Sequence, residues 1–330
     1  MLYLWVFLGS EFMIGWILLI ILGFVLLILG ANFLVDGASK IAKIFHIPEI
    51  IIGLTIVSIG TSMPELFVSV TSAMENYSDM AIGNVVGSNI CNLFLILGLS
   101  SIIRSIKFKK ETSFIDIPMC LFFSAVFWIF CNTGGGVSRL EGFGLVFLFL
   151  IFIGYTVFMG IIGMNRVASE NKKNTMQVSK FYFFQNVLLV IIGIVALKYG
   201  GDFVVDNTVL IAKKFNISEA IISLTILAVG TSLPELVTSV AAAFKGNSDI
   251  AIGNIIGSNI FNVLLIIGVA AVISPISYNS LYNLNIGILL FGTVLLALFP
   301  FIKPKDEMSR FNGIIFVILY GTYMGLLFFR

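Results

Sequence analysis

Residues 60–69 read GTSMPELFVS and residues 81–92 read AIGNVVGSNICN. The chain contains both segments a second time, as GTSLPELVTS at 230–239 and AIGNIIGSNIFN at 251–262. Each copy consists of apolar and small polar residues, with one glutamate in its first segment. Because a carboxylate at membrane depth costs free energy unless it has a partner, a glutamate that recurs in two such copies predicts a functional site.

The two glutamates, Glu65 and Glu235, lie in a longer repeat. Without a gap, residues 48–100 match residues 218–270 at 29 of 53 positions. No basic side chain lies within the central turns around either glutamate. We therefore interpret the pair as functional, although the glycines of the second segment are also typical of ordinary helix packing.

The composition is that of a polytopic membrane protein. The chain is 59% hydrophobic and 11% charged, and its mean hydropathy is +1.09. Apolar runs of about twenty residues favour α-helices over a β-barrel, whose strands alternate over about ten residues. We expect an all-α protein with ten transmembrane helices near residues 14–33, 47–73, 79–103, 114–132, 140–163, 182–204, 217–244, 249–274, 284–302 and 311–329.

The remaining composition excludes several classes of site. The net charge of +2 gives no indication of a nucleic-acid partner. Cys91, Cys120 and Cys131 have no CxxC spacing, and the only histidine is His46, so neither a zinc site nor a disulfide framework is predicted. No cofactor is expected, and a monomer is one admissible form.

The repeat divides the chain into two halves. We expect a first five-helix repeat at 13–164, a cytoplasmic linker at 165–180 and a second five-helix repeat at 181–330. Residues 1–12 resemble a leader of cloning origin, because Gly-Ser-Glu-Phe precedes a second methionine. We expect the protein to cross the cell membrane with both termini on the outer side. In this orientation fourteen basic residues lie on the cytoplasmic side and five on the outer side, as the positive-inside rule favours.

The two copies enter the membrane from opposite sides, because five spans separate them. Such inverted repeats are related by a pseudo-two-fold axis in the membrane plane, so Glu65 and Glu235 are expected to face each other near the midplane. Pro64 and Pro234 have no N–H group and interrupt their helices, which leaves backbone carbonyls without partners. Carboxylate, hydroxyl, amide and carbonyl oxygens together make a site for a hard cation, with Ca²⁺ and Na⁺ fitting best.

The charge of the site favours exchange over uniport. An empty site would carry two carboxylates through the membrane, whereas one divalent ion, two or more monovalent ions or two protons would neutralise them. A proton-coupled or broader divalent cation exchanger that uses the same glutamates therefore stays open. A gated cation channel is a third interpretation, and an intramembrane enzyme is a weak fourth, because no histidine or lysine is placed to activate a serine or threonine.

The paired GTSxPEL and GNxxGSNxxN segments resemble the alpha repeats of the calcium/cation antiporter superfamily, in its sodium/calcium exchanger branch. The resemblance covers nearly the whole chain. Proton/calcium members usually carry GNxxE at the glutamate, and this chain has Thr-Ser instead, which favours the sodium-coupled branch. The resemblance implies a secondary active antiporter, not an enzyme, that exchanges sodium for calcium by alternating access and is electrogenic.

The resemblance also implies roles for particular residues. Glu65 and Glu235 are expected to be shared by Ca²⁺ and Na⁺, and the Asn262 position is aspartate in some microbial and potassium-dependent members, so a third carboxylate is absent here. Helices one and six, which end in Asp36 and Asp206, are expected to slide over a fixed core. The other expected ligands are the carbonyls of Thr61, Thr231, Ser58 and Ala228, the hydroxyls of Ser62, Ser88, Ser232 and Ser258, and the central amides of Asn92 and Asn262.

Overall fold

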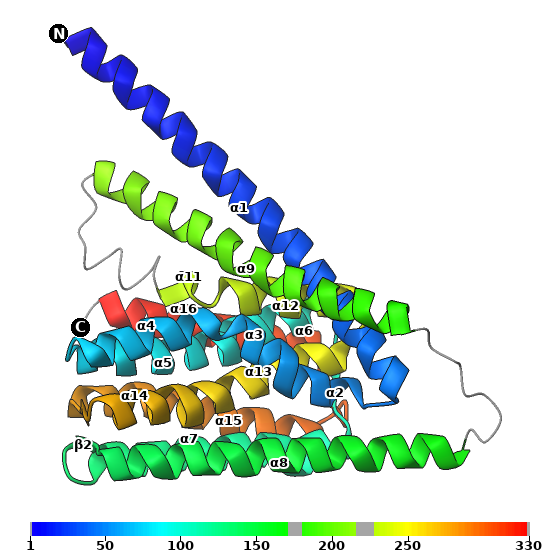
Figure 1. The fold of residues 1–330 in the computed structure, drawn as a ribbon. Helices are drawn as coiled ribbons and strands as arrows, with labels where there is room; N and C mark the ends of the chain where they lie inside the picture. Colours follow the sequence, from blue (N-terminus) through cyan, green and yellow to red (C-terminus); the bar gives the residue numbers. More distant parts are fainter. Residues whose placement is uncertain (1, 171–179, 216–227, 329–330) are drawn as a thin grey trace.

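The computed structural model describes residues 2–170, 180–215 and 228–328, and most of these residues are helical (Figure 1). Eight of the described helices are long and apolar enough to cross a membrane, and the bent pair Glu49–Thr61 and Met63–Met74 makes a ninth span. Helices of this length satisfy their own backbone hydrogen bonds in lipid. The prediction of an all-α polytopic membrane protein is therefore confirmed.

The seventh of the ten predicted spans is described only in part. Its residues 217–227 lie outside the described part of the chain, and the rest contains the short apolar helix α12 (Leu233–Phe244). Three helices are longer than expected, and one of them, Lys180–Lys214, continues ten residues beyond its predicted span. Helix α1 (Leu2–Phe45) begins inside the predicted leader, and α8 (Arg139–Glu170) continues into the predicted linker.

Helices α1 and α9 (Lys180–Lys214) pack along each other and cross the rest of the molecule obliquely (Figure 1). Glycines allow this close approach. A Cβ atom on Gly30 would lie 2.9 Å from the carbonyl oxygen of Gly193, and one on Gly23 would lie 2.8 Å from that of Gly200. Since small residues let membrane helices pack backbone to backbone, these contacts hold α1 and α9 together as an antiparallel pair.

The other elements follow the repeat in the sequence. The first copy consists of α2 (Glu49–Ile52), η1 (Gly53–Val57), α3 (Ser58–Thr61), α4 (Met63–Met74), α5 (Ser78–Ile90), η2 (Cys91–Ile96), α6 (Leu97–Ile103), β1 (Ile106–Lys107), η3 (Thr112–Asp116), α7 (Ile117–Asn132), β2 (Gly136–Val137) and α8. The second consists of α11 (Ala228–Gly230), α12, α13 (Ser248–Phe261), η5 (Asn262–Ile266), α14 (Ile267–Ile273), β3 (Ile276–Ser277), η6 (Ser280–Tyr282), α15 (Asn283–Leu298), η7 (Phe299–Phe301), β4 (Glu307–Met308) and α16 (Arg310–Phe328).

The spans that carry the GNxxGSNxxN segments form the centre of the molecule. Over the 18 most apolar residues of each span, the buried share is 72% in Ser78–Ile103 and 83% in Ser248–Ile273, against 28% in Arg139–Gly163. Both central spans contain a π-helical segment that begins beside the last asparagine of the segment: η2 starts at Cys91 and η5 starts at Asn262. Such π segments are frequent at functional sites because they shift the helical register.

The predicted helix interruption lies two residues before the proline. Helices α3 and α4 meet at Ser62 with a bend of 51°, and Ser62 has φ −87° and ψ 11°. Ser232 has nearly the same conformation, with φ −87° and ψ 7°. Pro64 and Pro234 lie in the first turn of the second half-helix, where an N–H group has no partner within the helix. The prolines therefore begin α4 and α12 rather than bend a continuous helix.

The two ends of the bundle differ in charge. At one end β1 pairs with β4, and at the other β2 pairs with β3, each as a two-residue antiparallel ladder. The first end, called the basic end below, carries Lys40, Lys43, Arg104, Lys107, Lys109, Lys110, Lys245, Lys303, Lys305 and Arg310. The second, called the opposite end, carries the loops after α4 and α14.

Candidate cation-binding site

The carboxylates of Glu65 and Glu235 lie in the first turns of α4 and α12, directly after the two helix breaks. Glu65 is 1% exposed and Glu235 is 0% exposed. They lie close enough to interact electrostatically. Neither forms an ion pair with a described residue. Two buried carboxylates that interact electrostatically and have no basic partner need positive charge from another source.

The Glu235 carboxylate is held by hydroxyls from both repeats. Ser62 Oγ, at the break of the first repeat, donates to Glu235 Oε1 at 2.6 Å and lies 2.9 Å from Ser258 Oγ. Ser258 Oγ lies 3.5 Å from the same Glu235 oxygen. A break in one repeat thus contacts the acid of the other, which brings the two glutamates to one centre.

The Glu65 carboxylate has the equivalent contacts, and its contact with the serine at the break of the other repeat is longer. Ser232 Oγ lies 3.4 Å from Glu65 Oε1, and Ser88 Oγ lies 3.5 Å from the same oxygen. All three side chains are buried. The four predicted serine ligands are therefore brought to the two glutamates, in two sets related by the sequence repeat.

Four buried oxygen atoms have no hydrogen-bond donor within the described chain, two on the glutamates and two on asparagines of the π segments that pack against α12 and α4. They are Glu65 Oε2, Glu235 Oε2, Asn92 Oδ1 and Asn262 Oδ1. An unpaired buried polar atom costs free energy, and an unpaired buried carboxylate oxygen costs most. Two carboxylate and two amide oxygens without donors are the ligands that hard cations prefer. This donor set fits a cation as the missing partner.

The amide groups of Asn92 and Asn262 are oriented by two asparagines that the sequence analysis did not select. Asn92 Nδ2 donates to Asn259 Oδ1 at 3.1 Å, and Asn262 Nδ2 donates to Asn89 Oδ1 at 2.9 Å. Each donation fixes which end of the amide is left as oxygen. The signal for Asn89 and Asn259 was present in the sequence, because both belong to the repeated GSN triplet.

The Thr61 and Thr231 side chains bond to a second pair of asparagines that the sequence analysis missed. Thr61 Oγ1 lies 3.1 Å from Asn254 Oδ1, and Thr231 Oγ1 lies 3.4 Å from Asn84 Oδ1. These hydroxyls are engaged across the repeats. The backbone carbonyls of the two threonines, which the sequence predicted as ligands, are beside the breaks.

Two predicted carbonyl ligands lie further along the same helices. The Ser58 carbonyl accepts the Ser62 N–H at 3.0 Å and lies 3.3 Å from Thr61 Oγ1. Ala228 is the first residue of α11, and the residues directly before it are outside the described ranges. Nothing in the geometry brings the Ser58 carbonyl to the glutamates in this conformation.

The site contains oxygen atoms and no other strong metal ligand. Among the described residues, no group of three or more His, Cys, Asp or Glu side chains is placed to bind a metal. The nearest thiol, Cys91, is buried beside Asn92. Soft metals that prefer sulfur or imidazole are therefore poorly matched by this donor set.

Relatives of the chain extend over nearly its full length. Inner membrane protein YrbG of Escherichia coli (strain K12) is 35% identical over 318 residues, which cover 94% of this chain and 96% of that protein. Sodium/calcium exchanger MaX1 of Methanosarcina acetivorans is 30% identical over 346 residues, covering 94% of this chain and 98% of that protein. The chain is thus similar to complete multi-pass membrane proteins.

A solved structure has the same fold. The sodium-calcium exchanger NCX_Mj, from a crystal soaked with Na⁺ and Sr²⁺, superposes with a TM-score of 0.83 at 31% identity, over 95% of this chain and 99% of that one. The sodium/calcium exchanger protein family matches residues 15–158 and 185–329, one segment in each repeat. The protein is therefore a member of the sodium/calcium exchanger family of membrane transporters.

Proposed function

We propose that the protein is a secondary active antiporter that exchanges sodium for calcium across the cell membrane, with the cations bound between Glu65 and Glu235. The observation that carries this proposal is the pair of buried carboxylates, each with one oxygen that has no donor and neither with a basic partner in the described chain. A divalent ion between them supplies both missing charges.

The ligand set follows from the contacts around the carboxylates. Glu65 and Glu235 bind both ions, and the Thr61 and Thr231 carbonyls complete the calcium shell. Asn92 and Asn262 offer their unpartnered amide oxygens to the central position. The hydroxyls of Ser62, Ser88, Ser232 and Ser258, with the carbonyls of Ser58 and Ala228 after rearrangement, serve the outer sodium positions.

The same charges couple the two ion fluxes. Moving one carboxylate through the bilayer centre costs about 2.5 to 3.5 kcal/mol on the lenient insertion scale, so an empty site with two carboxylates reorients rarely. A loaded site reorients because its charge is balanced. This difference makes the inward movement of one ion depend on the outward movement of the other.

The proposed topology has ten spans in two inverted five-helix repeats, and both termini are outside the cell. The hydrogen bonds between residues of equivalent position in the two repeats support this arrangement, as in the pair Asn89 and Asn259, which are 170 positions apart. The basic end is then cytoplasmic, as expected from the excess of lysine and arginine there.

Ion flux into vesicles tests the proposal. Proteoliposomes loaded with Na⁺ are diluted into sodium-free medium with labelled Ca²⁺, and uptake is compared with vesicles loaded with K⁺ or given only a pH gradient. We expect accumulation above equilibrium with internal Na⁺ alone. Accumulation driven equally well by protons would replace the proposal with a proton-coupled exchanger, and passive equilibration would replace it with a channel.

Membrane voltage tests the charge stoichiometry that the family resemblance implies. If three Na⁺ leave for each Ca²⁺ that enters, one net positive charge moves outward in this assay. A potential that is negative inside opposes that movement by about 2.3 kcal/mol per charge per 100 mV. Uptake should therefore slow when the vesicle interior is clamped negative, and a voltage-independent rate would contradict electrogenic exchange.

A further inference from the structure

An ion pair fastens α1 to the centre of the molecule at the basic end. Lys245 Nζ, directly after α12, donates to Asp36 Oδ1 of α1 at 2.7 Å and to the Asn32 carbonyl at 3.2 Å. Its side chain therefore bridges one helix of the antiparallel pair and one helix of the cation site. These three groups are called the Lys245 latch below.

Among the described residues, the two positions equivalent to Lys245 and Asp36 at the opposite end do not form such a pair. The two repeats are offset by 170 positions. Lys245 of the second repeat therefore corresponds to Glu75 of the first, and Asp36 of the first repeat corresponds to Asp206 of the second. A lysine and an aspartate at one end thus correspond to two carboxylates at the other. Neither Glu75 nor Asp206 forms an ion pair with another described residue.

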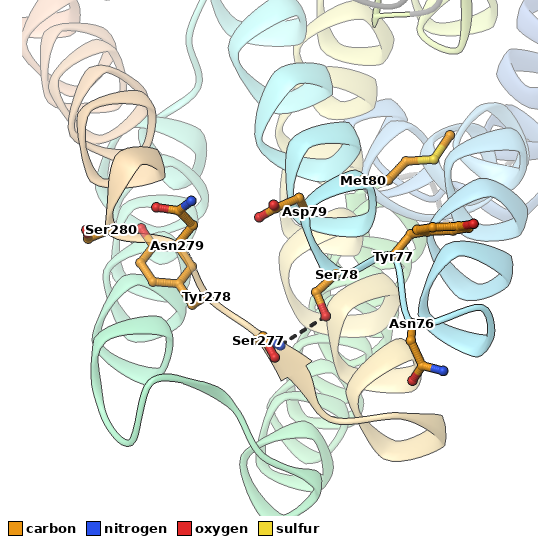
Figure 2. A pocket seen from close by; sticks show the side chains of 9 residues that line it. All are labelled: Asn76, Tyr77, Ser78, Asp79, Met80, Ser277, Tyr278, Asn279 and Ser280. Carbon is orange, nitrogen blue, oxygen red and sulfur yellow. Dashed lines mark hydrogen bonds between the residues drawn. The ribbon is translucent and has the colours of Figure 1, made fainter.

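The loops beside the latch show the same difference in charge. Lys109 pairs with Asp249 at the basic end. The equivalent residues at the opposite end are Asn279 and Asp79, which line an open pocket of about 870 Å³. Figure 2 shows the Asp79 carboxylate directed toward Asn279 across that pocket. Asp79 forms no ion pair with a lysine or arginine of the described residues.

The helices are arranged as the charges suggest. In Figure 1, α1 and α9 lie against the rest of the molecule near the start of α2 and diverge from it toward the end that carries β2. Helix α1 packs extensively against α12, whereas α9 makes no comparably extensive contact with α4 in the described part of the chain. In the described part of the chain, α1 is therefore packed against the second half-helix α12 at the basic end, and α9 is not packed in the same way against α4 at the opposite end.

We propose that Lys245 is a positioning residue for alternating access, which fastens α1 to α12 whenever the cytoplasmic side of the exchanger is closed. When the outer side closes, the inverted repeat brings Glu75 and Asp206 toward each other, and their repulsion opposes that closure. The proposal rests on the antiport function above, because it assigns the two sides of the transport cycle. The resting protein therefore prefers the state that is closed on the cytoplasmic side.

The expected effect is modest because the latch is partly exposed. The Lys245 and Asp36 side chains are 28% and 49% exposed. Ion pairs with this much solvent contribute little, and loss of one changes an equilibrium by about two- to five-fold. A change of that size is still measurable as a population, and added salt should reduce it because salt screens exposed charges.

Pulsed electron-paramagnetic distance measurements on full-length protein in nanodiscs test the proposal. Spin labels are attached at Met74→Cys on α4 and Leu210→Cys on α9, which are both exposed at the opposite end. The native cysteines are buried, so the label is expected to react with the two introduced cysteines. The ratio of long to short distances then reports whether the outer side is open, without any measurement of ion flux.

We expect Lys245→Met to lower the long-to-short ratio by about two- to five-fold, and Lys245→Arg to preserve it. Glu75→Lys places a lysine at the equivalent position of the opposite end and should also lower the ratio. Lys110→Met removes the same charge from an exposed lysine of the basic end that has no ion pair with another described residue, and should change nothing. Choline chloride at high concentration should reduce the Lys245→Met effect.

Three results would overturn the proposal: an unchanged ratio in Lys245→Met, an equal shift in Lys110→Met, or an unchanged ratio in Glu75→Lys. Circular dichroism and elution volume show that each variant is folded, and Lys245→Arg separates the loss of charge from the loss of the side chain. If the distances shift as expected while wild-type vesicles show no sodium-driven calcium uptake, the latch is retained and the proposed coupling fails.

Discussion

Asn89 and Asn259 exchange hydrogen bonds between the two repeats. Asn89 Nδ2 donates to the Asn259 carbonyl at 3.1 Å, and Asn259 Nδ2 donates to the Asn89 carbonyl at 3.3 Å. Both side chains are buried, and their remaining oxygens accept from Asn92 and Asn262. One reciprocal pair therefore holds the repeats in register and orients two candidate cation ligands.

Replacement of Asn89 by alanine should weaken both functions of this pair. We expect Asn89→Ala to lower stability by about 1–2 kcal/mol and to weaken calcium binding, because the Asn262 amide loses its partner. Thermal unfolding and calcium titration in detergent measure the two effects. Thr293→Ala is the control, because this buried hydroxyl bonds only within its own helix. Equal losses in the two variants would contradict the orienting role.

Neutralisation of either glutamate should stop exchange. We expect Glu65→Gln and Glu235→Gln each to abolish sodium-dependent calcium uptake into proteoliposomes while the protein stays folded and monodisperse. The reason is that one carboxylate leaves a divalent ion with an unbalanced charge in a medium of low dielectric constant. Glu111→Gln, which changes an exposed carboxylate, should keep wild-type uptake. A wild-type rate of calcium uptake in either site variant would show that the substituted glutamate is not a cation ligand.

An additional carboxylate at Asn262 should strengthen cation binding. Asn262 Nδ2 donates to Asn89 and its Oδ1 has no donor. In Asn262→Asp the donor is lost, and the new carboxylate faces the Asn89 oxygen and the site. Like charges favour uptake of a proton or of another cation. We expect calcium binding to become tighter and to gain a dependence on pH or on a monovalent ion, as measured by isothermal titration. Unchanged ion and pH dependence would place Asn262 outside the site.

Much of the fold could be predicted because the repeat is strong. The identity of the two copies and the length of the apolar runs were sufficient for the helical class and for the central position of Glu65 and Glu235. The sequence predicts the helix break at Pro64, because proline interrupts the interior of a helix. In the structure Pro64 occupies a first-turn position that tolerates it, and the break precedes it.

The asparagine network could not be predicted from composition alone. The three asparagines in each copy of the second segment are chemically alike, and only the packing of the two copies against each other decides which amides face the cations and which orient the others. The latch was also missed. Asp36 and Lys245 are 209 positions apart, and nothing in the local sequence of either residue indicates the contact.

Gly60 offers a test of the contact between the site and the antiparallel helix pair. A Cβ atom at this position would lie 2.7 Å from Ile194 Cδ1 and 2.8 Å from Ile194 Cγ1 of α9. Alanine at Gly60 therefore forces the Ile194 side chain to shift, which disturbs the contact between α9 and the helix break that carries Ser62. Overpacking of this kind costs about 1–3 kcal/mol. If this cost adds to the free-energy barrier of reorientation, the rate of exchange falls about five-fold or more.

We expect Gly60→Ala to reduce the rate of sodium-dependent calcium uptake while calcium binding at equilibrium changes less. Ile194→Ala removes both clashing atoms, so the double variant should recover most of the lost rate. Gly154→Ala is the matched control, because a Cβ atom there has no neighbour within 4 Å. Vesicle flux and calcium titration on the four variants separate movement from binding. A double variant as slow as Gly60→Ala would show that the loss arises inside the broken helix, through its backbone, and not from its contact with α9.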